Sequence, residues 1–263
     1  MGHDKLRKFA ENETFRCLLQ PASTEILGEN GIFDLNDHPV KGRWNETMFS
    51  SEDRPIVVEL GCGKGEYTID LALRTPDKNY IGVDIKGARL WKGAKYATEH
   101  NLPNVAFLRT RVEFLTALFA PQEVSEIWLT FSDPQMKSEN SRLTSPLFLE
   151  RYRSVLKPGG VVHLKTDSMF LHQYSVAVAK ANGLKILACT EDLYGNKREE
   201  SLPDALYEVQ TFYEKMFLEQ GYKITYLEFV IDHDGPYVYP EFDAAYWRSV
   251  EGPRRSFGHK ERE

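Results

Sequence analysis

Short apolar runs alternate with amphipathic stretches from about residue 55 to residue 231. The first run, residues 56–60, is rich in β-branched residues and leads into a glycine cluster. Runs of this length and composition are typical of buried parallel strands. The pattern predicts seven strands, at residues 56–60, 80–84, 105–108, 126–131, 161–164, 184–188 and 223–231.

The stretches between these runs carry apolar residues at helical spacing. They predict helices at residues 66–74, 88–100, 145–156, after Asp167, and at about 204–220. Strands that alternate with helices in this way indicate an α/β fold, an open sheet with helices on both faces and ligands at the carboxyl ends of the strands. The flanking residues lack this periodicity. We therefore expect an irregular N-terminal extension (1–54), a central domain (55–232) and a C-terminal tail without regular structure (233–263).

Composition and charge narrow the class of protein. The 263 residues carry a formal net charge of −6, and no window approaches the ~20 apolar residues of a membrane-spanning helix. The polar N-terminus argues against a signal peptide. Cys17, Cys62 and Cys189 lack metal-ligand spacing, so we expect a reducing, cytoplasmic compartment and no metal site. The negative charge does not favour nucleic-acid binding, which nevertheless needs only a local basic patch.

A glycine cluster directly after the first strand is the strongest local signal for a ligand. It consists of Gly61, Gly63 and Gly65, with Glu59 before it and Asp84 at the end of the next strand. Glycines let a ligand approach the backbone, and the following helix offers free N–H groups. A dinucleotide fingerprint has a different glycine spacing, and Glu59 suits a positively charged ligand such as S-adenosylmethionine. We favour S-adenosylmethionine, with a dinucleotide or a ligand-free turn as alternatives.

The third and fourth strand ends add further candidates. Val112 can pack on an adenine ring, and Arg111 either contacts that ring or is a solvated surface residue. Asp133 precedes Pro134, which biases it toward an extended conformation and places its carboxylate opposite the glycine cluster. On its own, Asp-Pro is also an ordinary turn sequence.

Three further site candidates are Asp167, Thr211 and Glu214, and each also has an ordinary structural explanation. Asp167, after the fifth strand, is either a helix N-cap or a site residue. Thr211 and Glu214 lie one helical turn apart, and a solvated helix face is their default explanation. Together with Lys137, these residues become candidates only because they follow strand ends.

Taken together, these motifs resemble the tRNA (guanine-N7-)-methyltransferase family of the TrmB type, in particular a Bacteroidetes-like branch of it. The resemblance covers roughly residues 55–230 and rests on VELGCGKGEY, YIGVDIKGARLWKGAK, VAFLRTRVEF, EIWLTFSDPQMK, LTSPLFLERYRSVLKPGGVVHLKTDS and TFYEKM. The first two segments are common to many methyltransferases. The segment from Asp133 to Lys137, followed by RLT and LKTD, is much more specific.

The resemblance implies a class I methyltransferase fold with a seven-stranded, mostly parallel sheet, S-adenosylmethionine as cofactor, and guanine 46 in the variable loop of tRNA as substrate. The matching cofactor and catalytic positions are Glu59, Asp84, Arg111 and Asp133, with Gly61, Gly63 and Val112 beside them. The matching substrate positions are Lys137, Asp167, Thr211 and Glu214. The chain departs from the family where F-P-D-P-W reads FSDPQ, where Arg111 replaces Asn or Asp, and where the basic stretch after Lys137 is diluted.

The substrate itself suggests how the reaction proceeds. Guanine N7 has a lone pair and no proton, so we expect catalysis by positioning, with Asp133 accepting hydrogen bonds from the base. The predicted tRNA contacts, each with a solvated surface as its alternative, are Lys5, Arg7, Lys8, Lys137, Arg142, Arg254, Arg255 and Lys260. We expect a monomer or weak homodimer. A methyltransferase for a small molecule or protein, and a non-catalytic RNA-binding module, are the remaining alternatives.

Overall fold

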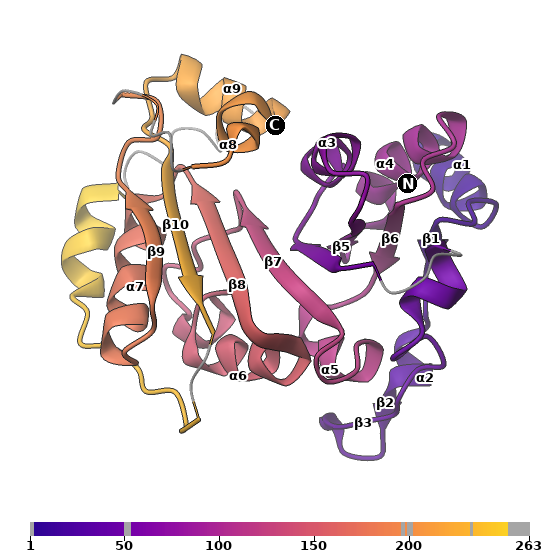
Figure 1. Ribbon diagram of the computed structural model, residues 1–263, viewed down its shortest axis with the longest axis horizontal. Coiled ribbons are helices and arrows are strands. Elements are labelled where there is room, and N and C mark those ends of the chain that lie inside the picture. The colour runs from indigo at the N-terminus through magenta and orange to yellow at the C-terminus, as the bar shows by residue number, and fades with distance from the viewer. Residues whose placement is uncertain (1–2, 50–53, 196–197, 199–201, 232–233, 252–263) are drawn as a thin grey trace.

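The predicted strands lie side by side in one open sheet. The computed structural model describes residues 3–49, 54–195, 198, 202–231 and 234–251, and its main sheet has the order β1-β6-β5-β4-β7-β8-β10-β9 (Figure 1). Strands β4 to β8 are mutually parallel, so their carboxyl ends meet at one edge, whereas β10 is antiparallel to β8 and β9. The seven predicted strands are β4 (Ile56–Leu60), β5 (Asn79–Asp84), β6 (Val105–Arg109), β7 (Val124–Thr130), β8 (Leu156–Thr166), β9 (Ile186–Thr190) and β10 (Thr225–Val230).

An eighth strand comes from the N-terminal region, which the sequence predicted to be irregular. β1 (Leu18–Leu19) pairs with β6 at the sheet edge. Asn12 donates a hydrogen bond to the carbonyl oxygen of Gly87 at 2.9 Å, and Trp91 donates one to Glu11 at 2.7 Å. Such long-range contacts order this region, so the prediction from local periodicity was wrong. Its other elements are α1 (His3–Asn12), α2 (Ser23–Ile26), β2 (Leu27–Gly28), β3 (Gly31–Leu35) and the π-helix η1 (Asn45–Phe49).

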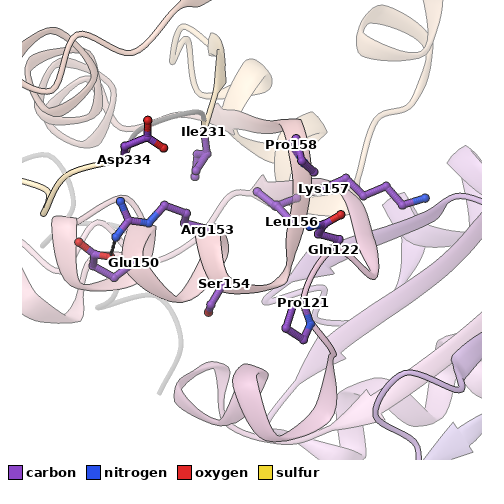
Figure 2. A pocket seen from close by; sticks show the side chains of 10 residues that line it. All are labelled: Pro121, Gln122, Glu150, Arg153, Ser154, Leu156, Lys157, Pro158, Ile231 and Asp234. Carbon is purple, nitrogen blue, oxygen red and sulfur yellow. Dashed lines mark hydrogen bonds and ion pairs between the residues drawn. The ribbon is translucent and has the colours of Figure 1, made fainter.

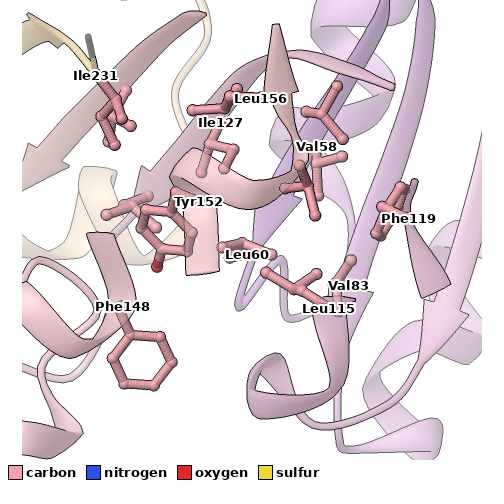
Figure 3. Close-up of a cluster of buried hydrophobic side chains, with 14 of the residues drawn as sticks. Val58, Leu60, Val83, Leu115, Phe119, Ile127, Phe148, Tyr152, Leu156 and Ile231 are labelled. Atoms are coloured by element: carbon pink, nitrogen blue, oxygen red, sulfur yellow. The ribbon is translucent and has the colours of Figure 1, made fainter. Parts of the chain in front are cut away.

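Helices cover both faces of the sheet, as predicted. On one face lie α3 (Glu66–Arg74) and α4 (Gly87–Glu99), and on the other lie α5 (Leu115–Leu118), α6 (Pro146–Val155) and α7 (Met169–Ala181). Successive strand residues point to opposite faces. Val57 therefore belongs to the core under α3 and α4, whereas Val58 and Leu60 belong to the core shown in Figure 3, together with Leu115 and Tyr152.

The segment between β9 and β10 contains two helices instead of the single helix predicted at 204–220. These are α8 (Asp204–Glu208) and α9 (Phe212–Glu219). Lys165 Nζ donates to the carbonyl oxygen of Leu206 in α8 (2.7 Å) and to that of Val209, between the two helices (3.2 Å). Thr211 then caps α9 by accepting a hydrogen bond from the Glu214 backbone N–H at 3.1 Å. The prediction was wrong because a side chain from the sheet, far along the chain, ends α8.

The C-terminal region also contains structure that its sequence did not predict. Residues 244–251 are helical, and this helix lies beside α7 (Figure 1). Two short 3₁₀-helices, η2 (Val112–Phe114) and η3 (Glu139–Ser141), follow β6 and β7. Among the described residues, no helix is both long enough and apolar enough to cross a membrane.

Candidate functional site

The loop after β4 has a backbone that only glycine adopts easily. Gly61 and Gly63 have φ angles of 78° and 58°, in the left-handed region. The N–H groups of Gly61 and Cys62 both donate to the carbonyl oxygen of Val83, at 2.8 and 3.0 Å, which ties the loop to β5. A Cβ atom built at Gly61 or Gly63 meets nothing within 4 Å. The loop therefore leaves open space in front of its backbone, as a ligand-binding loop requires.

Asp84, at the end of β5, is bonded directly to this loop. One carboxylate oxygen accepts from the Gly63 N–H at 3.0 Å, and the other accepts from the Lys86 N–H at 2.7 Å. A carboxylate oxygen has lone pairs for more than one donor. Asp84 can therefore hold the loop and still accept a hydrogen bond from a ligand hydroxyl.

Glu59 lies beneath the loop and is almost fully buried. Its two carboxylate oxygens accept hydrogen bonds from the hydroxyl groups of Thr68 on α3 and Thr130 on β7. Burial raises the pKa of Glu59 to about 7, against the opposing effect of these hydrogen bonds. A cation bound nearby would favour the ionised form, so this carboxyl group fits a positively charged ligand.

The residues predicted to contact the adenine, Arg111 and Val112, follow the end of β6. Arg111 is half-exposed, and its guanidinium group lies 3.2 Å from a carboxylate oxygen of Glu113 and 5.8 Å from the ring centroid of Phe114. Val112 begins η2 and packs partly buried against the core shown in Figure 3. The carbonyl oxygen of Asp84 accepts a hydrogen bond from the Thr110 N–H at 3.2 Å, which connects this turn to the glycine loop.

The corner after β7 carries Asp133. Phe131 and Gln135 have φ angles of 51° and 46°, which are unusual for residues other than glycine and occur preferentially at functional sites. Asp133 is exposed, and its side chain accepts a hydrogen bond from the Gln135 N–H at 2.9 Å. The Ser132 hydroxyl oxygen is buried and has no hydrogen-bond partner among the described residues. At this corner, therefore, both a buried hydroxyl group and an exposed carboxylate are available to hydrogen-bond a ligand.

At the end of β8, Asp167 is not the helix cap. Ser168 has that role, because its hydroxyl oxygen accepts from the Leu171 N–H at 3.1 Å. The cap interpretation of Asp167 was therefore wrong. Asp167 itself is largely buried directly before the first turn of α7.

The default interpretation of Glu214 as part of a solvated face was also wrong. Glu214 and Lys165 are both fully buried, and Lys165 Nζ lies 2.7 Å from a Glu214 carboxylate oxygen. The Tyr194 hydroxyl group donates to the same oxygen at 2.6 Å. Lys165 is not among the residues predicted from the sequence, although a lysine among the apolar residues of a buried strand is a signal that could have identified it.

The start of α9 lies next to the glycine loop. Lys64 Nζ lies 4.8 Å from the ring centroid of Phe212, and the Phe212 N–H donates to Glu66 at 3.0 Å. Figure 1 shows α8 and α9 beyond the carboxyl ends of β7 and β8. The Thr211–Glu214 turn, the glycine loop and the Asp133 corner therefore lie at one edge of the sheet.

The predicted basic residues differ in how available they are for RNA. Arg7 forms ion pairs with Asp4 (2.8 Å) and Glu11 (2.6 Å), and Lys8 pairs with Asp4 at 2.8 Å. Arg142 is only 3% exposed, which leaves it unsuitable for a surface phosphate. Lys5, Arg7 and Lys137 are exposed, although Arg7 is engaged in the ion pairs just described. The candidates outside the described residues are Arg254, Arg255 and Lys260.

A cavity of about 550 Å³ lies elsewhere, near the amino ends of β7 and β8 (Figure 2). Its lining includes Gln122, before β7, and Leu156, the first residue of β8. None of the predicted site residues lines this cavity. It is therefore separate from the candidate site at the carboxyl edge.

Comparison with known sequences decides the family. Residues 53–227 match a family described as "Putative methyltransferase". A protein of Christiangramia forsetii is 50% identical over 87% of this chain and 98% of its own length, and one of Bacteroides thetaiotaomicron is 44% identical over 97% and 98%. Both are named tRNA (guanine-N(7)-)-methyltransferase. The chain belongs to the tRNA (guanine-N7-)-methyltransferase family. The resemblance inferred from the motifs is confirmed.

Solved structures support the fold. The 16S rRNA methyltransferase KamB matches with a TM-score of 0.55 at 16% identity, over 79% of this chain and 99% of that chain. The 16S rRNA (adenine(1408)-N(1))-methyltransferase of Catenulisporales acidiphilia matches with a TM-score of 0.51 at 17% identity, over 76% and 96%. The predicted class I fold is confirmed, with β1 added to its seven strands.

Proposed function

We propose that this protein transfers a methyl group from S-adenosylmethionine to N7 of a guanine in tRNA, at position 46 of the variable loop. The observation that carries the proposal is the meeting of three elements at one sheet edge. These are the open glycine loop bonded to Asp84, the exposed carboxylate of Asp133, and the Thr211–Glu214 turn beside Lys64. The names of the relatives support tRNA as the substrate.

The cofactor side fits S-adenosylmethionine. The open space in front of Gly61 and Gly63 admits a ligand, Asp84 can accept from its ribose hydroxyl groups, and the buried Glu59 favours its positive charge. Arg111 and Val112 follow β6, at the position proposed for the adenine. When bound, the cofactor supplies an electrophilic methyl group on a sulfonium.

The substrate side needs no general base. Guanine N7 is a bare acceptor in the nucleic acid, so no residue has to remove a proton from it. Asp133 accepts hydrogen bonds from the N–H groups of the base, orients N7, and stabilises the positive charge that methylation leaves on the ring. Holding the reactants in line in this way can contribute ~7–11 kcal/mol to lowering the barrier. The base leaves its stack to reach Asp133.

The remaining predicted residues serve the tRNA. Lys137 is exposed two residues after Gln135 and can contact a phosphate near the flipped base. Asp167, Thr211 and Glu214 contribute to the substrate-binding surface, and Glu214 does so from its buried pair with Lys165. Phosphate contacts make the affinity fall as the salt concentration rises.

The same proposal includes the organisation of the protein. Residues 55–232 form the methyltransferase domain, with residues 1–54 as an extension and residues 233–263 as a tail. The protein acts in the cytoplasm as a monomer or weak homodimer.

A methylation assay tests the function. The protein is incubated with methyl-labelled S-adenosylmethionine and tRNA transcribed without modifications, and the digested tRNA is analysed for 7-methylguanosine. We expect label at guanine 46 and none in a transcript carrying adenine at this position. Cofactor binding without label in any tRNA would contradict the proposal and favour a small-molecule or protein substrate. RNA binding without cofactor binding would favour a non-catalytic RNA-binding module.

A further inference from the structure

The chain after β10 packs against the first turns of α7. We call residues 237–251 the C-terminal brace; they lie outside residues 53–227, which match the methyltransferase family. The Phe242 ring meets the rings of Phe170 and Tyr174 edge to face, with centroid distances of 5.5 and 5.4 Å. Such aromatic pairs stabilise the fold by more than the burial of their area alone accounts for. Figure 1 shows the yellow helix of this region alongside α7.

Glu251 fastens the end of the brace to the start of α7. One carboxylate oxygen accepts from the Ser168 hydroxyl group and the other from the Phe170 N–H, both at 2.6 Å. The glutamate side chain is only 7% exposed. A carboxylate at a helix N-terminus is stabilised by the free N–H groups and the helix dipole, and charged hydrogen bonds are the strong ones. Glu251 therefore fixes the turn that directly follows Asp167.

The rings of Phe170 and Tyr174 also contact, through Arg142, the loop after β7 that carries Asp133. The Arg142 guanidinium group lies 4.7 Å from the ring centroid of Phe170 and 4.3 Å from that of Tyr174. From there it donates to the carbonyl oxygens of Gln135 and Met136, both at 3.3 Å. Arg142 thus connects the loop that follows Asp133 to the rings on which Phe242 packs.

A second contact joins the brace to this loop. The Tyr239 hydroxyl group donates to the side-chain oxygen of Asn140 at 2.6 Å. The brace therefore touches both predicted substrate elements, at Asn140 and at Ser168.

We propose that the C-terminal brace positions two elements relative to each other: the loop after β7, which carries Asp133, and the turn before α7, which carries Asp167. Glu251 is the main positioning residue of the brace. This inference rests on the proposed tRNA methylation. A small displacement of a substrate-orienting group costs much of the rate. The brace thus sets the affinity for tRNA and the rate of methyl transfer, while the cofactor loop between β4 and α3 is held by its own bonds to Val83 and Asp84.

The experiment compares three variants of the full chain. Glu251→Ala removes both hydrogen bonds, and Glu251→Gln keeps an acceptor for the Phe170 N–H and a donor for Ser168. Glu241→Gln is the matched control, because Glu241 is exposed in the same part of the chain and its variant makes the same change of charge. For each protein, the melting temperature, the Kd for S-adenosylmethionine, and kcat and KM with tRNA are measured well below the melting temperature.

We expect kcat/KM for tRNA to fall by about 10- to 100-fold in Glu251→Ala and less in Glu251→Gln. The Kd for the cofactor should stay within about twofold of wild type. If Glu251→Ala does not fold, the same split between tRNA and cofactor in Glu251→Gln decides. Kinetics equal to those of Glu241→Gln would overturn the inference. A parallel loss of cofactor affinity would also overturn it, because it would show a purely structural role. If the wild-type protein methylates no tRNA, the proposed function fails independently of these variants.

Discussion

Lys165 Nζ lies 2.7 Å from a carboxylate oxygen of Glu214, and neither side chain is exposed. Lys165 comes from β8 and Glu214 from α9, so this pair fastens α9 to the sheet at the carboxyl edge. Burial lowers the pKa of Lys165, and the charge of Glu214 opposes this effect. The pair, together with the lysine bonds to the carbonyl oxygens of Leu206 and Val209, fixes the turn that begins at Thr211.

Removal of the lysine should destabilise the protein strongly. Lys165→Met leaves the Glu214 carboxylate buried without its countercharge, and breaking a buried pair in this way costs about 3–5 kcal/mol. The control Lys95→Met breaks the exposed pair with Glu99 and should cost about 0–1 kcal/mol. Urea unfolding measures both, and the double variant Lys165→Met/Glu214→Gln should recover part of the loss. Equal stabilities of Lys165→Met and Lys95→Met would contradict the role of the pair.

Glu59 should make the stability decrease as the pH rises. Its pKa is about 7 in the folded protein against a usual value of 4.5, so between these pH values the folded state holds a proton that the unfolded state has lost. The contribution of Glu59 to the free energy of unfolding is fully present below about pH 4.5 and is lost as the pH rises through about 7. The difference is about 3 kcal/mol.

Unfolding at pH 5 and pH 8 tests this dependence. Glu59→Gln has no carboxyl group to ionise, so its stability should fall less between the two pH values than that of wild type. The variant Glu241→Gln, at an exposed site, should keep the wild-type dependence. If Glu59→Gln and wild type show parallel pH curves, Glu59 does not titrate in this range.

Asp133 should matter for methyl transfer more than for cofactor binding. Asp133→Asn weakens the hydrogen bonds to the base and removes the negative charge near the cationic product. We expect the single-turnover rate at saturating cofactor to fall by about 100-fold or more, with a small change in the Kd for S-adenosylmethionine. The control is Asp77→Asn, which alters an exposed aspartate before β5 and should retain the wild-type rate. A near-normal rate in Asp133→Asn would exclude a catalytic role.

The sequence predicts most accurately those helices and strands whose bounds are determined by local patterns. The bounds of α3 agree with the prediction, because an amphipathic run between Gly65 and Pro76 defines a helix locally. The break between α8 and α9 depends on Lys165, some 40 residues earlier, and could not be read from the segment itself. In the same way, the burial of Glu214 and the order of α1 follow from contacts across the fold. The candidate residues were found at the expected strand ends, but their partners required the structure.

Gly63 offers the sharpest test of the cofactor loop. Gly63→Ala places a methyl group in the open space in front of the loop and requires a left-handed φ of 58° from a residue with a Cβ atom. The matched control is Gly183→Ala after α7, where φ is 62° and a Cβ also meets nothing within 4 Å. Both variants should lose about 1–2 kcal/mol of stability, because the left-handed conformation costs the same at both positions. Only Gly63→Ala should weaken S-adenosylmethionine binding, by about tenfold or more, in isothermal titration. If both variants bind the cofactor as wild type does, the space in front of Gly63 is not the binding site.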